Sequence, residues 1–246
     1  MHFIILLALT TLLAPPKKKI NVWLCGDSTM SIKDVKAYPE TGWGMPFAHF
    51  FDSTVTVQNF AKNGRSTKTF ISENLWQKVI DNVGEGDYVF IQFGHNDEAK
   101  EKVERYTTPE EYKANLLKFI KEARERKAIP VLLTPVSRRK FDSSNRQVET
   151  HAVYSTLVRE VATQTGVAFI DLDPKSRELY QQLGIEQSKL LFLQLQPGEH
   201  PNYPDGKIDN THFNELGARL IAQLVLKEIR AAKMELAERI VVPVKK

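Results

Sequence analysis

Short apolar runs recur along this chain and alternate with stretches of helical periodicity. In most of the runs the apolar residues are nearly continuous, which is typical of strands that are buried on both faces of a sheet. Five strands are predicted on this basis, over residues 20–25, 55–59, 88–93, 129–134 and 167–170. The segments between them are long enough for helices, so neighbouring strands are expected to run parallel.

The clearest helix is predicted to begin at Thr108-Pro109-Glu110-Glu111. Thr108 can cap its first turn, Pro109 suits the first helical position, and Glu111 completes a capping box. The apolar side chains that follow are spaced to form one buried stripe, which consists of Tyr112, Leu116, Phe119, Ile120 and Ala123.

Two further helices are predicted in the second half of the chain. One spans residues 148–165 and ends at Gly166, and the other starts near Asn214. The expected buried face of the last helix consists of Leu216, Leu220, Leu224 and Ile229. Strands that alternate with helices in this way predict an α/β fold: a three-layer αβα sandwich around a parallel sheet, with ligands bound at the carboxyl ends of the strands.

Composition restricts the possible classes of protein. The 246 residues are 42% hydrophobic and 26% charged, as in ordinary globular proteins, and no internal boundary divides residues 20–246, which we expect to form a single domain. The net charge of +4 is too small, and the basic residues too scattered, for nucleic-acid binding. The single cysteine, Cys25, ends an apolar strand and is expected to be a buried, inert thiol.

The N-terminus predicts export. Residues 3–14 form an apolar run as long as a signal-peptide core and too short to span a bilayer. Two prolines and three lysines follow, so residues 1–19 are interpreted as a signal peptide and short linker of a secreted or periplasmic protein without stable membrane association. A buried N-terminal strand or helix is the alternative, because the basic n-region and an A-x-A cleavage site are missing.

Four short motifs carry candidate chemistry. Ser28 follows the first strand in Gly26-Asp27-Ser28-Thr29, and Asp209 precedes His212 by three residues in a segment expected to be a loop. Such an aspartate can fold back onto the imidazole and leave its other nitrogen free as a base. Each pair alone is also explained by turns and helix caps, which are the commoner uses of these residues.

The other two motifs follow the second and third strands. Asn63-Gly64-Arg65 and Gly94-His95-Asn96-Asp97 can each supply a hydrogen-bond donor to a developing oxyanion: the Gly64 amide and the Asn96 side chain. Taken singly, each of these two motifs is equally well explained as a turn. All four motifs are expected at one edge of the sheet, and this convergence favours a serine hydrolase.

The four motifs together resemble those of the SGNH (GDSL-type) hydrolases, whose sheet is flavodoxin-like. Within that family the chain is most similar to rhamnogalacturonan acetylesterases, over most of its length from residue 20 to the last helix. Further stretches carry this resemblance: Gly26-Asp27-Ser28-Thr29-Met30, Gly42-Trp43-Gly44, Ser66-Thr67 after Arg65, Phe93 before Gly94, Thr134-Pro135-Val136 with Arg138-Arg139, and Phe213 after His212.

The resemblance implies roles for individual residues. Ser28 would be the nucleophile, His212 the general base and then acid, and Asp209 the group that orients His212. The Ser28 amide, the Gly64 amide and the Asn96 side chain would form the oxyanion hole. No cofactor is implied, and the sequence lacks the H-E-x-x-H and cysteine–histidine spacings of metal sites.

Six other residues are candidate substrate contacts: Trp43, Arg65, His95, Arg138, Arg139 and His200. An arginine fork fits the carboxylate of a galacturonate, and a tryptophan can stack on a sugar. The alternatives are solvated or salt-bridged arginines, a core tryptophan, a structural His95, and a His200 that only shapes the loop before the last helix.

The reaction expected from these features is hydrolysis of an acetyl ester on a pectin-type polysaccharide, by a monomer acting through an acetyl-enzyme. A lipase, a thioesterase or a deacetylase of another glycan remains possible within the enzyme class. A carbohydrate-binding module that retains the fold without the chemistry is the rival from another class.

Overall fold

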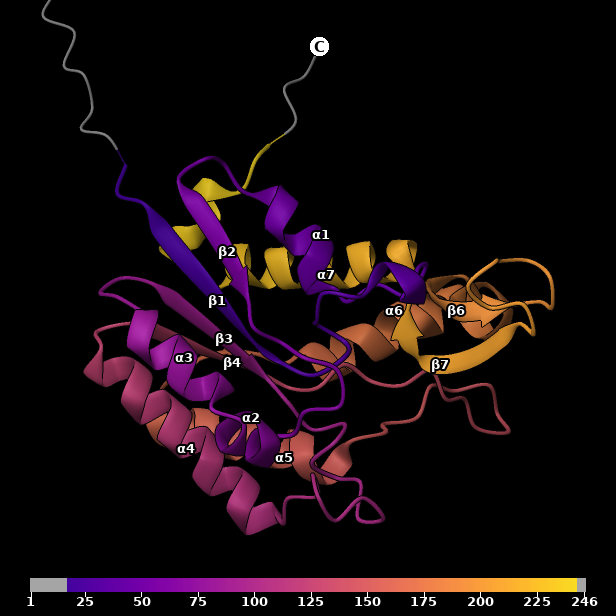
Figure 1. The fold of residues 1–246 in the computed structure, drawn as a ribbon, viewed down its shortest axis with the longest axis horizontal. Coiled ribbons are helices and arrows are strands. Elements are labelled where there is room, and N and C mark those ends of the chain that lie inside the picture. The colour runs from indigo at the N-terminus through magenta and orange to yellow at the C-terminus, as the bar shows by residue number, and fades with distance from the viewer. Residues whose placement is uncertain (1–16, 243–246) are drawn as a thin grey trace, which may run out of the picture.

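A five-stranded parallel sheet forms the centre of the molecule in the computed structural model, which describes residues 17–242 (Figure 1). Its strands are β1 (Ile20–Gly26), β2 (Val55–Asn59), β3 (Tyr88–Gln92), β4 (Ile129–Leu133) and β5 (Ala168–Ile170). All five predicted strands are confirmed, with ends shifted by at most one residue. The order β2-β1-β3-β4-β5 reverses direction at β1, so the crevice for a ligand lies at the carboxyl ends of β1 and β3.

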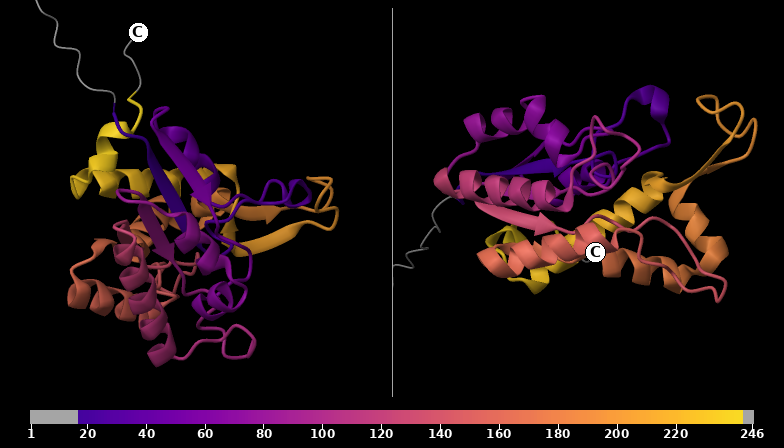
Figure 2. Two further views of the ribbon diagram at one scale, coloured as in Figure 1. Left: turned by 60° about the vertical axis from the view of Figure 1, so that its left-hand side comes forward. Right: turned by 90° about the horizontal axis from the view of Figure 1, so that it is seen from below.

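Helices cover both faces of the sheet and make three layers, which confirms the predicted sandwich (Figures 1 and 2). Successive residues of β1 point to opposite faces: Val22 and Leu24 enter one core, and Trp23 and Cys25 the other. The first face is covered by α1 (Gly44–Phe47), α6 (Leu172–Gln187) and α7 (Glu215–Ala231). The second is covered by α2 (Thr67–Ser72), α3 (Leu75–Asn82), α4 (Pro109–Glu125) and α5 (Ala152–Thr165).

Short 3-10 helices complete the chain: η1 (Val35–Ala37), η2 (Ala48–Phe50), η3 (Ser188–Leu191) and η4 (Glu235–Arg239). None of the helices within residues 17–242 is both long and apolar enough to cross a membrane. The apolar run at 3–14, and with it most of the predicted signal peptide, lies outside the described residues.

Helix α4 forms as predicted. Thr108 accepts a hydrogen bond from the Glu111 N–H (3.2 Å) and its own N–H donates to the Glu111 carboxylate (3.0 Å), which is the expected capping box. All five residues of its predicted stripe are buried.

Helix α5 ends where expected, before a left-handed Gly166 (φ 58°), but starts at Ala152 rather than at residue 148. The preceding residues are held by other contacts: Val148 N–H donates to the Lys140 carbonyl (2.8 Å) and Thr150 Oγ1 accepts from the Arg138 N–H (2.8 Å).

Helix α7 starts after its Asn214 cap as predicted, and its predicted buried face is wrong at Leu216 alone. Ile229 is buried as expected, and Leu220 and Leu224 are partly buried against the core. Leu216 is 50% exposed, whereas Gly217 faces the core against η3. A Cβ on Gly217 would lie only 1.9 Å from the Leu191 carbonyl oxygen, so this close approach decides which face turns inward. The buried face is made by Gly217, Ala218, Ile221, Ala222, Val225, Leu226 and Ile229.

An antiparallel hairpin of β6 (Phe192–Leu195) and β7 (Lys207–Phe213) was not predicted. The segment from Asp209 to His212, expected in a loop, is therefore part of a strand. Four residues of β7 (209–212) lie opposite the single Leu193 of β6, because Phe192 pairs with Phe213 and Gln194 with Ile208. This bulge bends the strand and redirects its side chains.

The hairpin tip lies beside the segment that follows β1 (Figures 1 and 2). Asn202 Nδ2 donates to the carbonyl of Tyr38 (2.9 Å), and the Tyr203 hydroxyl donates to that of Ala37 (2.8 Å). These contacts hold β7 against the carboxyl end of β1, although the two strands lie far apart in the sequence.

Candidate active site

Ser28 is presented by a tight turn at the end of β1. The Asp27 carboxylate accepts hydrogen bonds from the Thr29 N–H (2.9 Å) and hydroxyl (2.8 Å), and the Ser31 N–H donates to the Asp27 carbonyl (3.1 Å). Gly26 allows the strand to approach its neighbours closely, since a Cβ there would lie 2.8 Å from the Gln92 carbonyl oxygen. Ser28 is thereby fixed at the mouth of the crevice and remains 9% exposed.

The structure brings Ser28, His212 and Asp209 into one hydrogen-bonded line. Ser28 Oγ lies 2.9 Å from His212 Nε2, and His212 Nδ1 lies 2.8 Å from Asp209 Oδ2. The other oxygen of Asp209 accepts the backbone N–H groups of Thr211 (2.7 Å) and His212 (2.9 Å), within the bulge of β7. This arrangement can deprotonate the serine hydroxyl, which is the chemistry of a nucleophile with its base and orienting acid.

The surroundings of Asp209 favour its ionised form. Burial alone would raise its pKa, but the hydrogen bond and charge of the His212 ring and the two backbone N–H groups together hold that pKa well below its usual range. A carboxylate in this position favours the tautomer with the proton on Nδ1 and leaves Nε2 free to accept.

The expected oxyanion donors lie beside the serine. Ser28, Gly64, Asn96 and His212 line a common cavity of about 440 Å³. Gly64 has a left-handed backbone (φ 75°), and among the described residues neither its N–H nor that of Ser28 donates a hydrogen bond to another group. Asn96 Nδ2 donates one proton to the Arg65 carbonyl (3.0 Å), which leaves its second proton for the cavity.

Buried ionisable groups lie behind these loops. His95 Nδ1 is 3.3 Å from an Asp27 oxygen, the His95 and His151 rings are 4.2 Å apart, and His151 Nδ1 is 3.0 Å from Glu98. Burial and the nearby His151 lower the pKa of His95 to about 4, so this ring is neutral near pH 7. Burial would raise the pKa of Asp27, but its contacts with His95 and Thr29 lower it to about 2.

Two of the six expected substrate contacts line the cavity. His95 forms part of the wall, although it is 6% exposed. Arg138 also lines it, and its guanidinium is held by Glu98 (3.2 Å) and by Thr211 Oγ1 (3.2 Å).

The structure places the other four away from the cavity. Trp43 is fully buried, with its indole N–H on Gln92 (3.0 Å), and so cannot stack on a sugar. Arg65 pairs with Glu73 (2.9 Å). Arg139 points to the far side of β7, where it binds Asn210 (2.9 Å), and His200 packs beside Tyr38 at the hairpin tip (5.5 Å).

Three cations near Ser28 were missed in the sequence analysis. Lys33 lies directly behind Ser28, and Lys102 and Arg105 line the cavity from the segment between β3 and α4. Neither stretch belongs to a motif, and their importance depends on contacts between loops. A search of the sequence for charged residues after each strand would have included these three, but without any sign that distinguishes them from the other charged residues.

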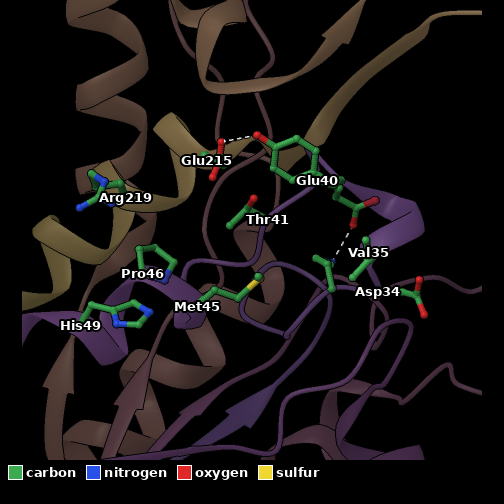
Figure 3. Close-up of a pocket in the computed structure, with 11 residues that line it drawn as sticks. Asp34, Val35, Glu40, Thr41, Met45, Pro46, His49, Glu215 and Arg219 are labelled. Atoms are coloured by element: carbon green, nitrogen blue, oxygen red, sulfur yellow. Dashed lines mark hydrogen bonds and ion pairs between the residues drawn. The ribbon is translucent and has the colours of Figure 1, made fainter. Parts of the chain in front are cut away.

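A second cavity, of about 380 Å³, is drawn in Figure 3. It is formed between the segment after β1, helix α1 and the start of α7, and its lining includes Met45, His49, Glu215 and Arg219. Lys33 lines this second cavity, and Glu40 lines both cavities. Since Ser28 and His212 line only the first, the first is the candidate reaction site.

The chain is similar to known proteins. The model of the GDSL-like Lipase/Acylhydrolase family matches residues 24–220. The rhamnogalacturonan acetylesterase RhgT of Bacillus subtilis (strain 168) is 42% identical over 225 residues, which cover 92% of this chain and 96% of the relative. The probable rhamnogalacturonan acetylesterase YesY of the same strain is 34% identical over 226 residues, covering 90% and 97%.

A solved structure agrees with the fold. The crystal structure of the Bacillus subtilis protein YXIM matches with a TM-score of 0.76 at 23% identity, and the match covers 89% of this chain and 58% of that one. This likeness shows the arrangement of strands and helices alone.

Proposed function

Because this chain belongs to the GDSL-like lipase/acylhydrolase family, we propose that it is an esterase that removes acetyl groups from rhamnogalacturonan. The observation that carries the proposal is the 2.9 Å contact between Ser28 Oγ and His212 Nε2, with Asp209 hydrogen-bonded to the opposite ring nitrogen. The acetylated polysaccharide is taken from the names of the two Bacillus relatives.

The reaction proceeds in two halves. Ser28 Oγ attacks the acetyl carbonyl carbon while its proton passes to His212 Nε2, and the carbonyl oxygen becomes an oxyanion facing the Ser28 N–H, the Gly64 N–H and Asn96 Nδ2. Collapse of this intermediate expels the sugar oxygen, which takes the proton from His212. Water then gives a proton to His212 and attacks the acetyl-serine. When this second intermediate breaks down, His212 returns the proton to Ser28 Oγ and acetate is released.

The character of the cavity supports a polar substrate. Apart from Ala99, Gly64 and the stems of longer side chains its lining is polar, which suits a sugar better than a long acyl chain. The lining carries charges of both signs: Lys102 and Arg138 lie in it together with the carboxylates of Glu40 and Glu101. A galacturonate carboxylate would have to bind at one of the cations, and Lys102 has no ion-pair partner among the described residues.

The first test is the variant Ser28→Ala. It should lower the rate of acetate release from acetylated rhamnogalacturonan by about 10⁴-fold or more, because the nucleophile is gone. Ser144→Ala, in an exposed loop, is the matched control and should retain full activity. Near-normal turnover by Ser28→Ala would refute the assignment.

Two further measurements separate the rivals. A lipase would hydrolyse p-nitrophenyl octanoate at least as well as the acetate, whereas an acetylesterase should lose activity sharply beyond short acyl groups. A binding module without chemistry would not react with an organophosphonate, which should label Ser28. Faster release of acetate from xylan than from rhamnogalacturonan would change the proposed polymer.

Export remains a proposal that is based on residues 1–19 of the sequence. That the enzyme acts as a monomer without a cofactor likewise remains a prediction. Detection of the chain in the culture medium would test export, and its elution volume in size-exclusion chromatography would test whether it is a monomer.

A further inference from the structure

The three proposed oxyanion donors come from three separate loops. Ser28 follows β1, Gly64 follows β2 and Asn96 follows β3. Strand pairing between β1 and β3 ends at Gly26–Gln92, and the last backbone hydrogen bond from the β2 side joins the Lys62 N–H to the Gly26 carbonyl (3.0 Å). Ser28, Gly64 and Asn96 all lie beyond these points, so the sheet itself does not fix the three donors. Donors to an oxyanion must be fixed to within a few tenths of an ångström, which requires contacts beyond the sheet.

Lys33 joins the first loop to the second. Its ammonium group donates to the Ser28 carbonyl (2.5 Å) and to Asn63 Oδ1 (2.8 Å), and it pairs with Glu40 (2.7 Å). An ammonium group has three protons, and all three have partners here. The side chain is 2% exposed, so these contacts are shielded from water.

Glu40 makes this buried charge tolerable. An unpaired ammonium at this depth would be costly, and the carboxylate of Glu40 is its only acidic ion-pair partner among the described residues. Figure 3 labels Glu40, and a dashed line marks a contact of its carboxylate. The pair forms part of the wall beside the reaction cavity.

Arg105 joins the second loop to the third. Its Nη1 donates to Asn96 Oδ1 (3.0 Å) and to the Gly64 carbonyl (3.4 Å). Because Oδ1 of Asn96 is engaged by the guanidinium, the amide nitrogen must face the other way, toward the Arg65 carbonyl and the cavity. Arg105 thus determines which end of the Asn96 amide an oxyanion would meet.

We propose that Lys33 and Arg105 are positioning residues that hold the three oxyanion donors in register, an arrangement that we call the cation clamp. Lys33 fastens the Ser28 loop to the Gly64 loop, and Arg105 fastens the Gly64 loop to Asn96. This inference rests on the proposed esterase function and extends it to two residues that no motif contains. Both positive charges also lie near the place where negative charge develops.

The test uses p-nitrophenyl acetate, which has neither a sugar nor a carboxylate, so polysaccharide binding does not contribute. Lys33→Met and Arg105→Gln should each lower kcat roughly 10- to 100-fold, with KM within about threefold of wild type, because misplaced donors act on the transition state. The inhibition constant of phenylboronic acid, whose tetrahedral adduct places an oxygen in the oxyanion hole, should rise by a similar factor.

Matched controls remove equivalent charges elsewhere. Arg239→Met removes another buried cation, which pairs with Glu235 (2.8 Å), and Arg159→Gln removes a half-buried one, which pairs with Asp171 (2.9 Å). Both should lower the melting temperature and leave kcat unchanged. The double variant Lys33→Met/Glu40→Gln should remain as slow as Lys33→Met, because the loss comes from the missing clamp and not from an orphaned carboxylate.

The inference is overturned if both clamp variants keep wild-type kcat, if only KM changes, or if Glu40→Gln restores the activity of Lys33→Met. Arg105→Gln alters a partly exposed side chain and decides the question by itself if Lys33→Met does not fold. An inactive wild type, or an active Ser28→Ala, would refute the proposed esterase and the clamp with it. An active wild type with unaffected clamp variants would refute the clamp alone.

Discussion

Replacement of Asp209 by asparagine is expected to disable His212 by inverting its tautomer. The two oxygens of Asp209 have different partners: Oδ1 accepts the N–H groups of Thr211 and His212, and Oδ2 accepts His212 Nδ1. An amide NH₂ cannot accept the two backbone protons, so the asparagine oxygen must take that position. Its NH₂ group then faces Nδ1 of the ring.

With an NH₂ donor opposite, Nδ1 has to be the unprotonated nitrogen. The ring proton moves to Nε2 and points at Ser28 Oγ, which lies 2.9 Å away, so the serine has no base. In enzymes with the same triad this substitution lowers kcat by about 10⁴-fold. That factor corresponds to about 5 kcal/mol of transition-state stabilisation.

The assay is kcat/KM for p-nitrophenyl acetate between pH 5 and pH 9. Asp142→Asn is a close control, because Asp142 Oδ1 also accepts two backbone N–H groups, those of Ser144 (2.8 Å) and Arg146 (2.9 Å), away from the cavity. That variant should retain wild-type activity. An Asp209→Asn enzyme within tenfold of wild type would show that Asp209 does not set the tautomer and would refute the reasoning.

Two other predictions follow from the loops around the cavity. Gly64→Ala should cost about 1–2 kcal/mol of stability, because its φ of 75° is unfavourable for a residue with a side chain. It should also lower kcat roughly 10- to 100-fold, because the new Cβ would lie 3.1 Å from Arg105 Nη1. An unchanged kcat would contradict this prediction. Asp97→Asn should steepen the pH dependence of unfolding. His95, with its pKa lowered to about 4, contributes stability that is lost as the pH falls from 6.5 to 4, whereas Asp97, with its pKa raised to about 7 by burial, contributes stability that is lost as the pH rises from 3.8 to 7. The two contributions oppose each other between pH 4 and 6.5. Without Asp97, the free energy of unfolding should therefore increase with pH more steeply than in wild type, by up to about 1.4 kcal/mol per pH unit. Urea denaturation at pH 4.5, 5.5 and 6.5 measures this, and the same pH dependence in both proteins would contradict the prediction.

The elements that the sequence predicted are those whose cause is local. A strand buried on both faces has to be apolar throughout, so its composition alone locates β1 and β3. The ends of helices are marked by side chains that satisfy free backbone groups, as Thr108 does for α4 and Asn214 for α7. Errors arose where distant contacts competed with such local rules, as at the start of α5 and at Gly217, whose approach to Leu191 turned the face of α7.

By itself the sequence determined the type of fold and the short motifs that carry the reacting groups, because apolar runs, caps and motif spacing are local properties of the chain. Only the tertiary structure decided which side chains from distant parts of the chain come into contact. It placed Ser28 against a histidine 184 residues away by means of an unpredicted hairpin, buried Trp43 and turned Arg139 aside. It also brought Lys33 and Arg105 to the loops that hold the oxyanion donors, because contacts between loops depend on how the strands are ordered and where each loop bends, and neither leaves a periodic trace in the sequence.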